Sequence, residues 1–184
     1  MKNTKTNFKT IDLVYIAVFA ALIAICSWIS IPAAVPFTLQ TFAVFLAAAL
    51  LGGKRGTLSV LVYILLGAIG IPVFAGFSGG VGVLFGTTGG YIIGFIFSAL
   101  IMWLFEKLFG RKTWALVLSM IVGLLVCYAF GTAWFMFMYI RTSGAVMLST
   151  VLGWCVFPFI LPDCIKIFMA FTLCKALRKV IKND

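Results

Sequence analysis

The 184-residue sequence contains no histidine and only four acidic residues, and both shortages narrow the classes of protein it can belong to. Its five cysteines lie in or beside apolar runs without a CxxC pair, so neither a metal site nor disulfides are expected. One carboxylate within an apolar stretch offers no acid/base pair, which argues against an intramembrane enzyme. The sequence also lacks a GxxxxGK[ST] phosphate-binding loop, so we expect no ATP hydrolysis and no cofactor.

Hydrophobic residues make up 64% of the chain and charged residues 10%, with a mean hydropathy of +1.23. A soluble protein of this length could not bury so many long apolar runs. We therefore predict an all-α integral membrane protein with a single membrane domain over residues 1–184. The basic start leads into the first run without an Ala-x-Ala cleavage site, so the first helix is expected to stay in the protein.

The apolar runs predict six transmembrane helices, since about 20 residues cross a hydrocarbon core of about 30 Å. The first five are expected over residues 11–29, 37–51, 57–71, 91–105 and 114–140, and the sixth begins near Pro162. Between them we expect an extended connector with two prolines at 30–36, a basic turn at 52–56, a charged turn at 106–112, a turn at 141–144 and a short helix at 145–157.

The basic residues gather at the ends of the apolar runs, and their distribution predicts the orientation of the chain. A net charge of +10 spread in this way indicates membrane topology rather than nucleic-acid binding. Arg141 falls alone on one side of the membrane. The other side carries Lys2, Lys5, Lys9, Lys54, Arg55, Lys107, Arg111, Lys112, Lys175, Arg178, Lys179 and Lys182. Both termini are therefore predicted to be cytoplasmic.

Residues 72–90, between the third and fourth predicted helices, contain seven glycines and no charge. A glycine-rich segment with exposed backbone groups cannot lie in lipid, so it must be buried in protein or line a cavity. The predicted topology places it on the external face. We expect it to act as a lid.

Asp163 and Lys166 lie within the last apolar stretch, three residues apart and hence on one face of a helix. Each would cost roughly 2.5–3.5 kcal/mol at a bilayer centre, so both must face protein, water or a ligand. One interpretation is a structural ion pair in which a carboxylate at the helix start is neutralised by the lysine. The favoured interpretation is a site for a ureido, amide or guanidinium-like group, which would donate to Asp163 and accept from Lys166.

Further candidate residues surround the predicted external connectors. Gln40 can donate and accept hydrogen bonds, towards either a ligand or a neighbouring helix. The start of the fourth helix is a candidate anion site because free backbone N–H groups point out of a helix N-terminus, although it could equally be only a helix start. The residues proposed there are Thr88, Gly89, Gly90 and Tyr91, with Phe74 added from the external loop.

The first helix carries alanines four residues apart, at Ala17 and Ala21 and again at Ala20 and Ala24. Small residues at this spacing let a second helix approach closely. The pattern fits either internal packing or a docking face for a partner protein.

The order of the motifs resembles a known family. The stretch VPFTLQTFAVFLAAALLGGKRGTLSVLVYILLGAIGIPVFAG, then GTTGGYIIGF and the PDCIK segment, is similar to the biotin-specific S components of energy-coupling factor (ECF) vitamin transporters. This resemblance implies six helices in the cell membrane of a prokaryote and high-affinity capture of biotin from outside. It also implies a shared module of a transmembrane coupling protein and two ATPases, with Ala17 and Ala21 docking on the coupling protein.

The ureido group of biotin carries two N–H donors and a carbonyl, which match Asp163 and Lys166. Its carboxylate would then reach backbone N–H groups or Tyr91 near the external mouth, although the reverse orientation, with the carboxylate on Lys166, remains open. Two other functions also remain open. An autonomous proton-coupled transporter of a small vitamin-like solute would use Asp163 as its proton site, and its expected inverted repeat is not visible. A channel lacks the expected ring of like charges.

Overall fold

The computed structural model describes residues 9–181, so the predictions for Lys2, Lys5 and Lys182 lie outside the described residues. The longer helices in this range are α1 (Thr10–Trp28), α2 (Gln40–Leu51), α3 (Gly53–Ala68), α5 (Gly89–Phe109), α6 (Thr113–Ser143) and α8 (Phe157–Ile181). Shorter elements are the 3₁₀ turn η1 (Ala75–Phe77), α4 (Val81–Leu84) and α7 (Leu148–Cys155), together with the strands β1 (Ser30–Ile31) and β2 (Phe37–Thr38).

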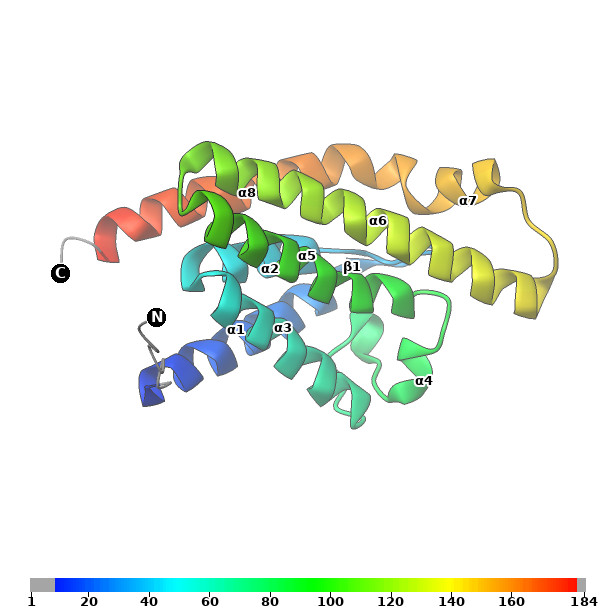
Figure 1. Ribbon diagram of the computed structural model, residues 1–184. Helices are drawn as coiled ribbons and strands as arrows, with labels where there is room; N and C mark the ends of the chain where they lie inside the picture. The colour runs from blue at the N-terminus through cyan, green and yellow to red at the C-terminus, as the bar shows by residue number, and fades with distance from the viewer. Residues whose placement is uncertain (1–8, 182–184) are drawn as a thin grey trace, which may run out of the picture.

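The longer helices run roughly along one axis of an elongated bundle (Figure 1). α1 begins and α8 ends at the same end of this bundle, whereas α4 and α7 lie at the opposite end. α5 and α6 form an extensively packed pair, and α1 and α5 both pack on α3. This arrangement places the glycine-rich segment and the α6–α7 connection far from the two chain ends.

The short helix α2 lies at the centre of the bundle. It packs against α1, α3, α5 and α8, and its residues 43–49 are all buried. At about 1.5 Å per residue its twelve residues extend only about 18 Å. Because protein rather than lipid surrounds it, α2 does not need the length of a lipid-facing span.

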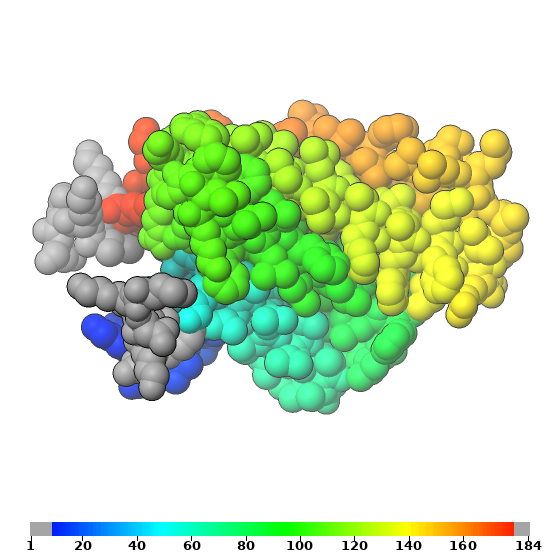
Figure 2. All heavy atoms as spheres, in the orientation of Figure 1, coloured from blue at the N-terminus to red at the C-terminus, as the bar shows by residue number. Residues whose placement is uncertain are grey.

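Four segments are long and apolar enough to cross a membrane: Thr10–Trp28, Gly89–Phe109, Thr113–Ser143 and Leu148–Arg178. α2 and α3 are shorter than the other long helices, so the count of six spans does not follow from helix length alone. α5 and α6 form the upper part of the face seen in Figure 2, and their outer surfaces expose large apolar side chains. Leu100, Leu104, Leu118, Ile121 and Leu125 are among them. Such a surface suits hydrocarbon, and the chain is a multi-pass membrane protein.

The first predicted span agrees with α1 to within one residue at each end. The predicted basic turn at 52–56 is wrong, because only Gly52 breaks the chain, with φ of 87°, and Gly53 to Gly56 already form the first turn of α3. A side chain at Gly52 would overlap Arg111, and one at Gly53 would overlap Trp103. The two glycines therefore let α5 approach this junction closely.

The other predicted helix ends differ in both directions. α2 begins at Gln40 rather than at residue 37, α3 ends at Ala68 rather than at residue 71, and α7 is shorter than the predicted helix at 145–157. α5 and α6 extend into the predicted charged turns, so residues 106–109 and 141–143 are helical. α8 begins at Phe157 rather than near Pro162, which lies within the helix. The extra turns of α5 and α6 have a physical reason, since polar residues at a membrane surface can continue a helix that begins in lipid, where helical hydrogen bonding is obligatory.

The two predicted connectors also contain structure of their own. The Pro-rich segment forms a small antiparallel hairpin in which Ser30 pairs with Thr38 and Ile31 with Phe37, so the all-α prediction needs this correction. The glycine-rich segment folds into η1 and α4, and two tryptophan side chains donate hydrogen bonds to its backbone. Trp28 donates from Nε1 to the carbonyl of Pro72, and Trp134 donates to the carbonyl of Gly86.

Candidate functional site

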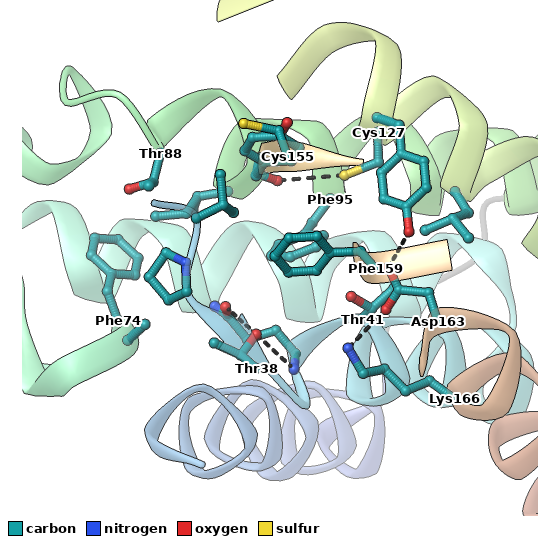
Figure 3. A pocket seen from close by; sticks show the side chains of 18 of the residues that line it. Thr38, Thr41, Phe74, Thr88, Phe95, Cys127, Cys155, Phe159, Asp163 and Lys166 are labelled. Carbon is teal, nitrogen blue, oxygen red and sulfur yellow. Dashed lines mark hydrogen bonds and ion pairs between the residues drawn. The ribbon is translucent and has the colours of Figure 1, made fainter. Parts of the chain in front are cut away.

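A cavity lies inside the bundle towards the end that carries α4 and α7 (Figure 3). Residues from α2, α5, α6 and α8 form its walls together with the β-hairpin and the glycine-rich segment. Six of the residues predicted from the sequence line it: Gln40, Phe74, Thr88, Tyr91, Asp163 and Lys166. These residues are far apart in the sequence, and the fold brings them to one enclosed site.

The two charged residues of α8 form an ion pair at one side of this cavity. Nζ of Lys166 lies 2.7 Å from Oδ1 of Asp163, and the residues are only 4% and 2% exposed. Asp163 is the seventh residue of α8, beyond the first turn in which a helix dipole acts on a carboxylate. The interpretation of Asp163 as a carboxylate at the helix start therefore does not fit, although the pair itself is present.

Tyr128 and Phe37 complete the surroundings of the ion pair, and the sequence did not point to either. The hydroxyl of Tyr128, on α6, donates to Oδ2 of Asp163 at 2.5 Å. The ammonium of Lys166 lies 4.4 Å from the ring centroid of Phe37, a cation–π geometry. A carboxylate offers about four acceptor sites and an ammonium three donors, so these bonds leave capacity for a polar ligand.

The opposite side of the cavity carries hydroxyl and aromatic groups. Thr88 and Phe74 lie across the cavity from Asp163 and Lys166 in Figure 3. Phe74 is fully buried and meets Tyr63 edge to face, with centroids 5.5 Å apart. The hydroxyl of Tyr91 is 2.9 Å from the hydroxyl of Thr132 on α6. Tyr91 is thus held in place by a hydrogen bond within the bundle.

Gln40 lies at the start of α2 and is held by hydrogen bonds on both sides. Its Nε2 donates to the hydroxyl of Tyr63 on α3, and its Oε1 accepts from the hydroxyl of Thr38 at 2.9 Å. The interhelical hydrogen bond considered for this residue is therefore present. Gln40 also lines the cavity, so its amide shapes the wall between the polar side and the glycine-rich segment.

Gly89 and Gly90 are not among the residues that line the cavity. A Cβ atom at Gly89 would lie 1.8 Å from the carbonyl oxygen of Leu84, and one at Gly90 would lie 2.3 Å from Cβ of Trp134. Both glycines therefore serve close packing, of α5 against the loop and against α6. The predicted anion site at these two glycines is not supported by their positions.

Apolar side chains line the space between the two polar sides. They are Val83, Ile92, Phe95, Leu124 and Phe159, with the thiols of Cys127 and Cys155 beside them. Phe159 stacks on Phe37, with ring centroids 5.2 Å apart. A cavity with polar groups at both sides and an apolar middle suits a small amphipathic molecule with a polar head, an apolar tail and a second polar group.

The two alanine pairs of α1 face in different directions. Ala20 and Ala24 are buried within the bundle, and Ala17 and Ala21 are exposed on its surface. The first pair therefore serves internal packing. The second pair is on the outer surface, where another helix can approach.

The fold and the cavity define a class: a small multi-pass membrane protein that encloses a binding cavity for a small amphipathic molecule between its helices and a glycine-rich loop. Comparison with known proteins is more specific. The chain matches the BioY family over residues 1–183, and it belongs to that family.

Several curated relatives cover nearly the whole chain. The chain is 43% identical over 170 residues to the biotin transporter BioY of Thermotoga maritima, covering 92% of this chain and 96% of that protein. It is 40% identical to a probable biotin transporter BioY of Pyrococcus horikoshii, covering 92% of this chain and 98% of that protein. It is also similar to the crystal structure of the S component for biotin from an ECF-type ABC transporter. That similarity has a TM-score of 0.80 at 30% identity and covers 97% of this chain and 95% of the other.

Proposed function

We propose that this chain is the membrane-embedded biotin-binding subunit of an ECF-type importer, which captures biotin at the external face and changes no covalent bond. The observation that carries the proposal is the buried Asp163–Lys166 pair at one side of an amphipathic cavity. The names of the relatives support biotin as the ligand.

The polar and apolar groups of biotin follow each other in the same order as the polar and apolar walls of the cavity. The ureido N–H groups would donate to Asp163, and the ureido carbonyl would accept from Lys166. The apolar tail would lie along Phe95 and Phe159. The carboxylate would then reach the far side of the cavity, where the hydroxyl of Thr88 is available as a donor.

The cavity of about 100 Å³ is smaller than the roughly 300–1,000 Å³ typical of ligand pockets. Entry of a molecule as large as biotin therefore requires a wall to move. The part of the glycine-rich segment after Phe74 is the wall proposed to move, because none of residues 75–88 is buried, whereas Val73 and Phe74 are fixed in the core. It would act as the lid over the site.

The proposed topology has six spans with both termini in the cytoplasm. α1 begins and α8 ends at one end of the molecule, where α3 also begins, α5 ends and α6 begins (Figure 1). In the sequence, Lys54, Lys107, Arg111, Lys112 and Lys175 belong to these helix ends or lie close to them. Such a cluster of cations favours the cytoplasmic side. The cavity would then lie in the outer half of a prokaryotic cell membrane, accessible to external biotin.

Energy for uptake would come from partners, namely a transmembrane coupling protein and two ATPase subunits. The sequence lacks a phosphate-binding loop, so ATP hydrolysis requires other chains. Ala17 and Ala21 would form the docking face, because both are exposed and leave room for a closely packed helix.

Equilibrium binding of radiolabelled biotin to the purified, detergent-solubilised chain tests the proposal. We expect tight binding by the unmodified chain and strong loss in Asp163→Asn and Lys166→Ala. Lys112→Gln serves as the matched control, because Lys112 is an exposed cation at the far end of the molecule. Absence of binding by the unmodified chain would reject biotin as the ligand. Unchanged binding in both site variants would reject the ion pair as the recognition site.

A further inference from the structure

A second cavity lies at the end of the bundle where α1 begins, far from the site described above. Its walls come from three places: the start of α1, the junction of α2 with α3, and the end of α5. α1 and α5 both pack on α3, and the lining residues make the cavity a groove where the start of α1 and the end of α5 meet the start of α3. The groove has a volume of about 700 Å³.

The groove carries a surplus of positive charge. Five cations line it, Lys9, Lys54, Arg55, Lys107 and Arg111, against two carboxylates, Asp12 and Glu106. The walls therefore contribute a net charge of about +3 at neutral pH, by the ordinary ionisation of these side chains. A surplus of this size favours an anionic ligand.

Both carboxylates of the groove are engaged by protein groups. Asp12 pairs with Arg55 at 2.8 Å and accepts a hydrogen bond from the backbone N–H of Lys9. Glu106 pairs with Arg111 at 2.5 Å and accepts from the backbone N–H of Gly53. These bonds hold the three walls of the groove together. The surplus of positive charge therefore lies in a groove whose walls are joined by defined contacts, and not on scattered surface lysines.

The two helices that border the groove expose apolar side chains in or near it. Ile11 and Tyr15, which line the groove, are 53% and 44% exposed, and Leu104 and Leu108 of α5 are also exposed. Trp103 lines the groove beneath Lys107, whose Nζ lies 4.4 Å from the indole ring centroid. Aromatic and basic residues above apolar ones are typical of the membrane–water interface.

We propose that this groove binds the phosphate-bearing headgroup of an anionic phospholipid, whose acyl chains lie against the exposed apolar surface of α1 and α5. The lysines and arginines would neutralise the phosphate, and the apolar side chains would contact the glycerol and upper acyl region. Basic pockets between transmembrane helices bind anionic headgroups through the same electrostatic attraction. The bound lipid fixes the depth and tilt of this end of the protein in its leaflet. The proposal does not depend on biotin as the ligand of the other cavity.

Native mass spectrometry of the full chain, released from detergent with equimolar phosphatidylglycerol and phosphatidylcholine of identical acyl chains, tests this proposal. We expect bound phosphatidylglycerol to exceed phosphatidylcholine by at least tenfold. The double variant Lys9→Gln/Lys107→Gln should lose most of this preference, since each interfacial cation contributes about 1 kcal/mol, or about fivefold. The preference should also weaken as ionic strength rises.

The matched control is Lys112→Gln/Lys175→Gln, which removes the same charge from exposed positions at the same end of the molecule but outside the groove. This control should retain the preference of the unmodified chain. Equal binding of the two lipids by the unmodified chain would overturn the proposal. Equal loss in both double variants would also overturn it, because it would indicate general surface attraction instead of a site. All variants should elute as single symmetric species, and the mass readout requires no biotin.

Discussion

Replacing one residue of the buried Asp163–Lys166 pair should destabilise the protein far more than replacing both residues together. The two side chains are 3% and 5% exposed and lie 2.7 Å apart, so removal of either leaves a buried charge without its main partner. Such losses cost about 3–5 kcal/mol, whereas replacement of both charges by neutral groups of similar volume is often nearly neutral. We therefore expect Asp163→Asn and Lys166→Met each to lower stability by about 3–5 kcal/mol.

The assay is a double-mutant cycle on the free energy of unfolding, measured by titration with SDS in mixed micelles. The double variant Asp163→Asn/Lys166→Met should be more stable than either single variant, with a coupling energy of at least about 2 kcal/mol. Its biotin affinity should nevertheless fall more than about 100-fold, because hydrogen bonds to charged groups contribute about 1.5–3 kcal/mol each.

This combination separates a structural role of the pair from a binding role. A stable double variant that binds biotin as tightly as the unmodified chain would show that the pair serves stability alone. Strictly additive losses of stability would refute the reasoning about a coupled buried pair. Lys112→Gln again provides the control, since an exposed lysine should change neither quantity.

Three further predictions follow from particular contacts. Tyr128→Phe removes the hydroxyl that bonds the buried carboxylate, so we expect a loss of about 1.5–3 kcal/mol in unfolding experiments and weaker biotin binding in the same sample. Gly67→Ala places a methyl group 2.0 Å from the Phe74 ring, and the unfolding midpoint should fall by the equivalent of about 1–3 kcal/mol, whereas an unchanged midpoint would contradict the packing described. Ala17→Leu should abolish co-purification with the coupling protein while leaving biotin binding intact, and Ala20→Leu, at a buried position, should instead reduce the yield of folded protein.

The charged pair was predictable from the sequence because its physical signal is strong. A carboxylate and an ammonium in an otherwise apolar stretch must be compensated, and the helical spacing of Asp163 and Lys166 places each within reach of the other. The helices α1, α5 and α6 were also predictable, because a helix that crosses the hydrocarbon core of a membrane must be long and apolar.

Tyr128 and Phe37 were not predictable, because their roles depend on how distant segments pack. Tyr128 precedes Asp163 by 35 residues and belongs to another helix. Nothing local distinguishes it from the other aromatic residues of a chain in which 16% of residues are aromatic. A tyrosine within an apolar span, whose hydroxyl needs a buried partner, is the one signal that could have singled it out.

The role of glycine was the hardest to predict from the sequence. Gly89 and Gly90 suggested an anion site, and Gly52 and Gly53 suggested a longer turn. In the structure Gly53, Gly89 and Gly90 allow close approach of α5 to its neighbours. A glycine chosen for close packing and one chosen for backbone freedom look alike in a sequence, and only the neighbouring atoms distinguish them.

An experimental structure of this chain solved with biotin would show directly whether the ligand lies against the Asp163–Lys166 pair. We expect density for biotin in the cavity of Figure 3, with the ureido ring within hydrogen-bonding distance of Asp163 and Lys166 and the carboxylate towards Thr88. Biotin found in this cavity with its carboxylate on Lys166 would reverse the proposed orientation. Biotin bound elsewhere, with the ion pair and Tyr128 remote from it, would contradict the assignment of the site.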